Sequence, residues 1–546
     1  MKGMFKRALA GVAAAALAAT GLALAAGSAS AAPTESITIV NSQTGSTYSA
    51  YRFAEFGNYQ ATDTHINTVD VTTNTDVLVK VTDAVKAAGV TVEAPYTTNP
   101  AALVATFDDA TLRKFADAFV FDGLHADGTV QGTDGQDVTI DGLEQGWYLV
   151  HDSQGKTMMV TSTIDGYQTM TINGLQETLG RIVAKSNTPT KPVKTADEVN
   201  QALGVGSTVH YTVKWDLPNV AGYDPATVTY ILRDKPSKGL TVAKSDVKIY
   251  VADKNGTLAS TTEGFGWLPA DVKVTEITLD GSKFGGFTDS NATMVGDGQK
   301  TFTIDLSDWI KADANAKYAG ATLYVRYGAT INGDVQSNPT VTNEADVTQA
   351  PDEEFTGDTT TTVKIGKFEF TKYGVDADAA KLVGATFKVW AGTEAGADDA
   401  ALKFTKSAVS AGADGQYVYD ADNATAGASA EIKSGADGKV VVNGLPAGDY
   451  TVKETIPAPG YATQFMPTFT VTVKADGTWE LKSADTFGLA TGTTTDIRVK
   501  NVKLITQLPM TGAAGTALFT VLGLLIAGAG ALVYMKSRNV KHALRG

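Results

Sequence analysis

The stretch TFTVTVKADGTWEL, residues 468–481, decides the fold class of this 546-residue chain. Apolar and polar side chains alternate along it, and an Asp-Gly pair interrupts the alternation. Runs of the same kind recur as TVHYTVKW at 208–215, ATLYVRYGAT at 321–330 and YTVKET at 450–455. Short period-2 runs separated by Asp-Gly and Asn-Gly turns are typical of all-β sandwiches. The sequence therefore predicts an all-β protein.

Helical pattern is sparse, and domain boundaries follow from composition. The best helix candidates, 73–89 and 108–123, both lie in the first third, where we expect an excursion from the sheets. Stretches rich in proline and threonine at 186–195 and 350–362 break the strand pattern. The predicted units are a signal peptide at 1–31, three tandem immunoglobulin-like sandwich domains at 33–185, 190–347 and 363–503, and a terminal segment at 508–546.

A Gly/Ala/Asp-rich segment at 391–438 interrupts the third predicted domain. We expect it to form long surface loops around the strand QYVYD at 416–420. A disordered insertion fits the composition equally well.

Both ends of the chain carry export signals. Lys2, Lys6 and Arg7 precede an Ala/Leu-rich run that closes on Ala-Ser-Ala at 29–31, so we expect a mature chain that starts near Ala32. A two-span membrane protein is the alternative that this cleavage pattern argues against.

Near the other end, residues 513–535 carry no charge and are long enough to cross a bilayer as a helix. Lys and Arg residues follow directly, which by the positive-inside rule predicts a cytoplasmic tail and an extracellular body.

Composition excludes several classes of function. The net charge is −14, which disfavours nucleic acid as a partner, and the absence of cysteine excludes disulfides. Five scattered histidines and the lack of HExxH or GxSxG motifs predict no enzyme, no cofactor and no metal site. The Asp-rich loops at 126–137 and 420–427 lack the EF-hand order of ligands and are predicted to be hairpin turns.

The pentapeptide LPMTG at 508–512, followed by an apolar run and a basic tail, resembles the cell-wall sorting signal of Gram-positive surface proteins. In that family sortase cuts between Thr and Gly and passes the Thr carbonyl to an amine. The resemblance implies recognition through Leu508 and Pro509, and cleavage between Thr511 and Gly512.

The third predicted domain opens with KFEFTKYG, contains YTVKET and closes with TDIRVKNVK. These segments resemble the collagen-adhesin B-type repeat of Gram-positive pilins and adhesins, in which a Lys amine forms an isopeptide bond with an Asn. The resemblance implies that Lys372, Glu454 and Asn501 form this triad. Strand alternation places Lys372 on the same face as Phe368 and Phe370, which favours an inward side chain. An exposed Lys372–Glu454 pair is the alternative that the pattern leaves open.

The second predicted domain, with PVKTADEV, VTYILRDKPSKG and VTNEADV, resembles the middle domain of shaft pilins. The implied triad is Lys194, Asp234 and Asn343, with Lys191 as an alternative nucleophile. A solvent-facing Asp234 in a turn remains open. The first domain resembles the N-terminal domain of the same pilins but shows no convincing triad.

The stretch GRIVAKSNTPTKP lies where shaft pilins carry a VYPK-type acceptor lysine, although Val183 and Ala184 replace Tyr and Pro. The resemblance implies Lys185 as the intersubunit acceptor, with Lys191 and Lys194 as alternatives.

The predicted function is a backbone pilin joined through Thr511 to a lysine of the next subunit and anchored to peptidoglycan at the cell surface. Its expected partners are pilus-specific and housekeeping sortases, identical subunits and an accessory tip pilin. A singly anchored LPxTG adhesin is the alternative.

Overall fold

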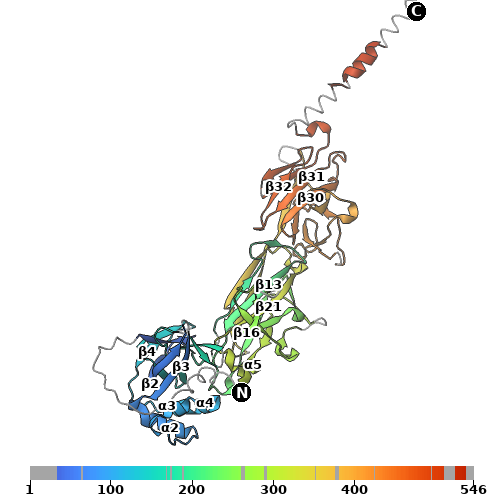
Figure 1. Cartoon of the computed structure of the whole chain (residues 1–546). Coiled ribbons are helices and arrows are strands. Elements are labelled where there is room, and N and C mark those ends of the chain that lie inside the picture. The colour runs from blue at the N-terminus through green and yellow to red at the C-terminus, as the bar shows by residue number, and fades with distance from the viewer. Residues whose placement is uncertain are drawn as a thin grey trace, which may run out of the picture.

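The computed structural model describes residues 34–509 apart from 63–64, 134, 168, 173–174, 187, 189, 260–264, 288–291, 351, 376–379, 423–424 and 494, together with 523–524 and 526–535. Three β-rich units follow one another along the molecule, and the C-terminal segment extends from the last (Figure 1). We call them the first unit (35–183), the middle unit (193–365) and the last unit (367–500). The prediction of an all-β chain of tandem sandwiches is confirmed.

The first unit packs helices onto a large sheet. A sheet in the order β7-β6-β2-β3-β8-β9, with β4 beside β2, faces a three-stranded sheet β10-β1-β5. Helices cover the large sheet where Phe115 packs against Phe53, with ring centroids 5.4 Å apart. The predicted helices at 73–89 and 108–123 are thus confirmed as part of this unit. Its elements are β1 (Glu35–Val40), β2 (Thr47–Ala61), β3 (Ile66–Thr73), α2 (Leu78–Ala87), α3 (Pro100–Val104), α4 (Asp109–Ala118), β4 (Gly128–Gln131), β5 (Val138–Leu143), β6 (Gly146–Asp152), β7 (Thr157–Thr161), β8 (Thr169–Ile172), β9 (Leu175–Thr178) and β10 (Arg181–Val183).

The middle unit is a sandwich of two sheets. One runs β11-β13-β21-β15-β19 with β16 and β17 attached, and the other runs β12-β23-β22-β14-β20-β18. Along these strands every second side chain points into the core. In TVHYTVKWD these side chains include Val209, Tyr211 and Val213. Its elements are β11 (Val193–Ala196), β12 (Ala202–Leu203), β13 (Thr208–Asp216), β14 (Ile231–Pro236), β15 (Leu240–Ala243), β16 (Lys248–Leu258), β17 (Lys273–Ile277), β18 (Phe284–Gly285), β19 (Thr293–Val295), β20 (Phe302–Asp305), α5 (Ser307–Lys311), β21 (Thr322–Ile331), β22 (Thr340–Thr348) and β23 (Thr359–Ile365).

The predicted end of the middle domain at 347 falls inside this unit. The segment 350–362, expected to be a linker, leads into β23, which pairs with β22 from Thr340↔Lys364 to Ala345↔Thr359. A threonine-rich strand satisfies its backbone groups in a sheet as readily as an apolar one. The middle unit therefore extends to Ile365.

The last unit is a second sandwich, with sheets β26-β27-β29-β24-β34-β33 and β28-β25-β30-β31-β32. Residues 468–481 form the antiparallel pair β31–β32, and Gly477 turns the chain with φ +80. Its elements are β24 (Lys367–Tyr373), β25 (Thr386–Ala391), β26 (Phe404–Lys406), β27 (Gln416–Tyr419), β28 (Ile432–Lys433), β29 (Lys439–Asn443), β30 (Gly448–Ile456), β31 (Thr468–Val473), β32 (Trp479–Ser483), β33 (Ala490–Thr493) and β34 (Asp496–Lys500).

The segment 391–438 contributes more than surface loops. The predicted strand at 416–420 is confirmed as β27, which runs parallel to β29. Phe404, Tyr417 and Ile432 from this segment enter the core of the last unit. The disordered-insertion alternative is therefore wrong for the described part of the segment.

Within the described residues, no helix combines the length and apolar character needed for a membrane span. The predicted span at 513–535 lies partly outside the described residues. Residues 526–535 are helical, with Leu532, Val533 and Tyr534 exposed.

Candidate functional site

The first and last strands of the last unit lie side by side. In β24, Phe368, Phe370 and Lys372 point inward because burial alternates along the strand. Strand β34 runs parallel to β24, with Lys372 opposite Val499. The chain then continues to Asn501, whose backbone N–H donates to the Tyr373 carbonyl at 2.9 Å. Strand pairing therefore brings a lysine and an asparagine from opposite ends of this unit together.

A carboxylate from the facing sheet joins these two residues. Lys372 Nζ donates to Glu454 Oε2 at 2.8 Å, and Asn501 Nδ2 donates to the same oxygen at 2.8 Å. Asn501 Oδ1 accepts from the Ala458 N–H at 3.1 Å, which fixes the amide orientation. Lys372, Glu454 and Asn501 are all 0 % exposed, so the alternative of an exposed Lys372–Glu454 pair is wrong.

Burial changes the protonation of this cluster. It lowers the pKa of Lys372 to about 8 and raises the pKa of Glu454, against the opposing effect of Lys372. Glu454 Oε1 has no hydrogen-bond partner among the described residues. Both shifts favour the neutral amine beside a protonated carboxyl group, and only a neutral amine is nucleophilic.

The middle unit holds a second cluster of this type. Lys194 on β11 donates from Nζ to Asp234 Oδ2 on β14 at 2.6 Å, and both side chains are 0 % exposed. Asn343 on β22 is also fully buried. The alternative of a solvent-facing Asp234 is therefore wrong.

In the middle unit a fourth residue completes the contacts. Tyr327 on β21 donates its hydroxyl to Asp234 Oδ2 at 2.6 Å and accepts from Asn343 Nδ2 at 2.9 Å. Burial lowers the pKa of Lys194 to about 8 and raises the pKa of Asp234. The sequence analysis missed Tyr327, although alternation in ATLYVRYGAT places it on one face with Leu323 and Val325.

Lys185 lies at the junction of the first and middle units. It forms a β-bridge with Asn219, whose side-chain amide donates to the Val183 carbonyl at 3.0 Å. Lys185 is 5 % exposed and borders a hollow of about 420 Å³, lined mainly by polar groups that include Asp152 and Lys156. Burial lowers the pKa of Lys185 to about 7, with a smaller contribution from nearby cations.

The two alternative acceptor lysines lie in different surroundings. The Lys191 side chain is 79 % exposed, with Nζ 4.0 Å from Asp358 Oδ1. Lys194 is enclosed in the middle-unit cluster.

Of the predicted sorting residues, Leu508 and Pro509 are described, whereas Thr511 and Gly512 lie outside the described residues.

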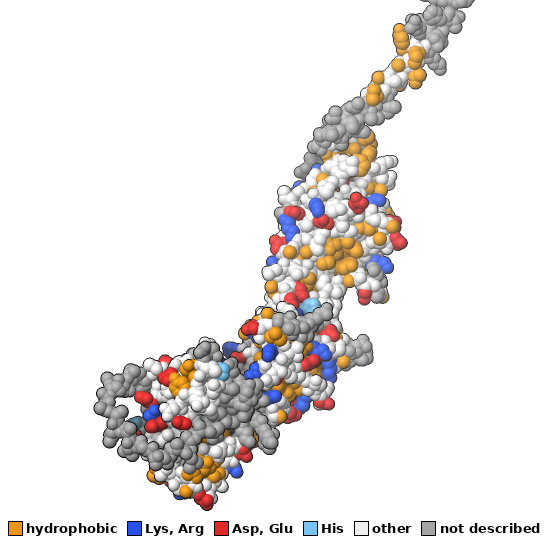
Figure 2. All heavy atoms as spheres, viewed as in Figure 1, with side chains coloured by type: hydrophobic (Ala, Val, Ile, Leu, Met, Phe, Trp, Pro, Cys, Tyr) orange, Lys and Arg blue, Asp and Glu red, His pale blue; other side chains and the backbone are white. Residues whose placement is uncertain are grey.

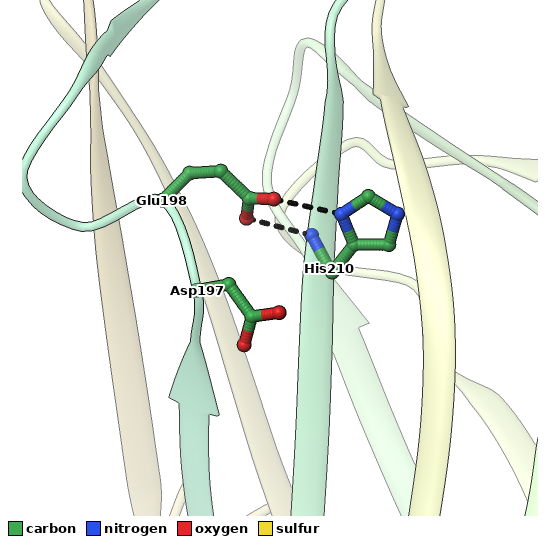
Figure 3. Close-up of side chains that lie close together, drawn as sticks. All are labelled: Asp197, Glu198 and His210. Atoms are coloured by element: carbon green, nitrogen blue, oxygen red, sulfur yellow. Dashed lines mark hydrogen bonds and ion pairs between the residues drawn. The ribbon is translucent and has the colours of Figure 1, made fainter. Parts of the chain in front are cut away.

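One further cluster contains residue types that bind metals. Asp197, Glu198 and His210 approach one another at the edge of the middle unit (Figure 3). Glu198 accepts from the His210 backbone N–H at 2.9 Å and lies 2.7 Å from His210 Nδ1. Asp197 is engaged by Arg326. These contacts make the cluster a polar clamp between β13 and the turn after β11.

The face of the molecule seen in Figure 2 is mixed in charge. Figure 2 shows Lys/Arg and Asp/Glu side chains interspersed over the visible face of the units. Interspersed charges favour solubility over binding to a polyanion.

Two family models match parts of the chain. Residues 366–486 match the SpaA prealbumin-like fold domain, and residues 505–542 match the LPXTG cell wall anchor motif of Gram-positive proteins. The chain is therefore a cell-wall-anchored surface protein. More particularly, it carries a SpaA-type domain directly before its anchor. No curated protein matches the chain.

Solved structures with similar folds include three pilus proteins. The pilus 2b backbone protein of group B streptococcus is 19% identical over 57% of this chain and 98% of its own, with a TM-score of 0.33. The T6 backbone pilin of Streptococcus pyogenes is 15% identical over 87% and 100%, with a TM-score of 0.35. The RrgB pilus protein of Streptococcus pneumoniae is 13% identical over 88% and 100%, with a TM-score of 0.37. At these TM-scores the likenesses do not define partners or activity for this chain.

Proposed function

We propose that this chain is the structural subunit of a covalently polymerised pilus, or fimbria, on the wall of a Gram-positive cell. The observation that carries the proposal is Lys185, an almost buried amine at the junction of two units in a chain with an LPXTG anchor. A lysine beside a Pro-Thr linker is ordinarily solvated, with a pKa near 10.4. A pKa of about 7 leaves half of the Lys185 amines neutral at pH 7. An ordinary lysine is neutral in roughly one molecule in two thousand.

The polymerising step is an acyl transfer. Sortase breaks the Thr511–Gly512 peptide bond and holds the Thr511 carbonyl as an acyl group. The neutral Lys185 amine of the next subunit attacks that carbonyl, forms an amide, releases the enzyme and loses one proton. The apolar run at 513–535 would hold the precursor in the membrane until this step, and the signal peptide at 1–31 would export it.

Other partners follow from the same chemistry. Pilus-specific sortase would join the subunits, and a housekeeping sortase would pass the finished fibre to peptidoglycan. The subunit at the tip donates its C-terminal acyl group but accepts none, so an accessory pilin that lacks an acceptor lysine would fit there. No cofactor enters this scheme.

Two internal bonds would strengthen each subunit. In the last unit, Lys372 Nζ attacks the side-chain carbonyl carbon of Asn501, a new C–N bond forms, and the amide nitrogen leaves as ammonia. Glu454 touches both reacting nitrogens, which suits a group that takes a proton from the amine and gives one to the leaving nitrogen. In the middle unit, Lys194 and Asn343 would react in the same way beside Asp234.

The test is an immunoblot of wall extracts boiled in SDS, from wild type, Lys185→Ala and Lys191→Ala. We expect a high-mass ladder in wild type and in Lys191→Ala, and monomer alone in Lys185→Ala. Lys191→Ala is the matched control because Lys191 is exposed on the same linker. A ladder that persists in Lys185→Ala would move the acceptor elsewhere. A single band in wild type would contradict the pilus and leave a singly anchored wall protein.

A further inference from the structure

The two buried clusters differ in how the carboxylate reaches the asparagine. In the last unit, Glu454 Oε2 accepts from both Lys372 Nζ and Asn501 Nδ2. In the middle unit, Asp234 Oδ2 accepts from Lys194 Nζ at 2.6 Å, and Asn343 Nδ2 donates to the hydroxyl of Tyr327 at 2.9 Å. Asn343 also lies close enough to Asp234 to lower the pKa of that carboxyl group. Aspartate is one methylene shorter than glutamate. Toward the asparagine Nδ2, the Tyr327 hydroxyl makes the contact that Glu454 Oε2 makes in the last unit.

We infer that Tyr327 is a catalytic residue of the proposed middle-unit bond, in which its hydroxyl relays a proton from Asp234 to the departing nitrogen of Asn343. The inference rests on the proposed function, because it concerns the internal bond assigned there to Lys194 and Asn343.

Neighbouring rings hold the Tyr327 side chain in place. Tyr327 is 1 % exposed, and its ring packs edge-on against Phe302 with centroids 5.4 Å apart. The ring centroid of Tyr211 lies 5.5 Å from that of Tyr327. The hydroxyl donates to Asp234 at 2.6 Å and accepts from Asn343 Nδ2 at 2.9 Å, so its oxygen lies within a single proton transfer of both groups.

Tyr211 shows that burial beside the lysine does not by itself produce this arrangement. Its ring centroid is 5.0 Å from Lys194 Nζ, similar to the 5.5 Å of Tyr327. Its hydroxyl has no hydrogen-bond partner among the described residues. Of these two core tyrosines, only Tyr327 bridges the acid and the amide.

The reaction balances without an added reactant. Neutral Lys194 Nζ bonds to the side-chain carbonyl carbon of Asn343 and gives one proton to the Asp234 carboxyl group. Tyr327 passes its hydroxyl proton to Asn343 Nδ2 and regains one from Asp234. The C–N bond to Nδ2 then breaks and ammonia leaves, so acid and tyrosine return to their starting forms.

The experiment compares the full-length chain with Tyr327→Phe and Tyr211→Phe. Samples taken at intervals after synthesis are digested, and mass spectrometry measures the fraction of Lys194 joined to Asn343. General acid–base groups contribute roughly 10² to 10⁴ in rate, so we expect Tyr327→Phe to slow bond formation at least about a hundredfold. Tyr211→Phe should keep the wild-type rate. The Lys372–Asn501 bond in each sample is the internal reference, because it should form at the wild-type rate in the last unit, and Tyr211→Phe controls for the loss of a core hydroxyl in the middle unit.

A second variant separates chemistry from packing. Asp234→Glu combined with Tyr327→Phe supplies the carboxylate length found in the last unit, so it should restore much of the lost rate. Wild-type rates in Tyr327→Phe, or no recovery in the double variant, would overturn the relay. A wild-type chain that never joins Lys194 to Asn343 would overturn it together with the middle-unit bond. In that case the high-mass ladder that depends on Lys185 should still form, so the proposed pilus would not be contradicted.

Discussion

Lysine is rarely buried, yet Lys194 and Lys372 are enclosed in the cores of two units. Removing such charges from water costs several kcal/mol per ion unless partners compensate. Each amine meets a carboxylate, and each carboxylate keeps one oxygen without a hydrogen-bond partner among the described residues. A buried carboxylate oxygen without a hydrogen bond lowers the stability of the fold, so this arrangement suits a reactive site better than a purely structural one.

Part of this arrangement could be predicted from sequence. Alternation in KFEFTKY carries Lys372 inward with Phe368 and Phe370, and the structure agrees. Tyr327 could not be assigned a role in this way, because its contacts join β21, β14 and β22, which are far apart in the chain. Hydrogen bonding across a sandwich depends on register and sheet packing together.

At residue scale, Glu454→Gln should prevent the Lys372–Asn501 bond. Glutamine keeps the shape of the side chain but cannot exchange a proton as a carboxyl group does. The intact mass should then exceed that of wild type by about the one ammonia that is no longer lost. Loss of a link that closes a loop of about 130 residues should lower the free energy of unfolding by roughly 4–5 kcal/mol, measured in urea.

The control for this variant is Glu369→Gln on β24, the strand that carries Lys372, where the glutamate pairs with Lys439 and is partly exposed. It should retain the wild-type mass change. Bond formation at the normal rate in Glu454→Gln would remove the carboxyl group from the mechanism.

A second prediction concerns the charge of Lys185. NMR of ¹³C-methylated lysines, with Lys185→Arg to assign the signal, should give a titration midpoint of about 7. Because the folded pKa lies below the unfolded value of 10.5, the unfolded chain binds more protons between these pH values. The free energy of unfolding should therefore rise as the pH increases from about 7 to 10.5. This rise should be larger in wild type than in Lys185→Met. A midpoint near 10.4 would show a solvated amine.

At the scale of elements, hairpins were predictable and the middle-unit boundary was not. Residues 468–481 carry their own turn and partner, so the pair β31–β32 follows from local sequence. Strand β23 has a linker-like composition, and only its pairing with β22 reveals it as a strand. Local pattern decides hairpins, whereas tertiary context decides strands such as β23, which lies between β12 and β22.

A buried ion pair fixes the segment that precedes β23, residues 353–356. Arg233 on β14 donates from Nε and Nη2 to the two carboxylate oxygens of Asp346 on β22, each at 2.8 Å. Arg233 also donates to the backbone carbonyls of Glu353 and Glu354. The Thr356 N–H donates to Asp346 at 2.8 Å. The pair thus fastens the segment before β23 to the sheet.

Arg233→Ala should therefore destabilise the middle unit strongly. Removing one partner leaves the Asp346 carboxylate buried without its counter-ion, which costs roughly 3–5 kcal/mol. Chemical denaturation followed by fluorescence of the middle unit would measure this loss. Lys235→Ala is the matched control, because its pair with Glu344 is partly solvated and should contribute at most about 1 kcal/mol. Equal losses of stability from the two substitutions would contradict this role of the Arg233–Asp346 ion pair.

At the scale of the whole molecule, the tandem order of units was predictable, but their contacts were not. The first and middle units meet where Ser186 N–H donates to the Asn219 carbonyl at 3.0 Å. The middle and last units meet where Gln336 Oε1 accepts from the Ser407 hydroxyl at 2.9 Å. These polar contacts depend on loop conformation, which strand patterns do not specify.

The arrangement suits a chain under tension. The units follow one another along the molecule, with the C-terminal segment extending beyond the last unit (Figure 1). A Lys372–Asn501 bond would join β24 to the residue after β34, so a pull on the chain would bypass the strands between them. With Lys185 linked to the next subunit, covalent bonds would carry the load through the middle and last units.

The central claim is that Thr511 of one subunit is joined to Lys185 of the next, and isolated wall material tests it directly. Protease digestion followed by tandem mass spectrometry should find a branched peptide in which the Thr511 carbonyl is bonded to Lys185 Nζ. The same digest of Lys185→Ala should lack it. Thr511 found only on a wall-peptide amine, with Lys185 unmodified in every wild-type peptide, would contradict the account.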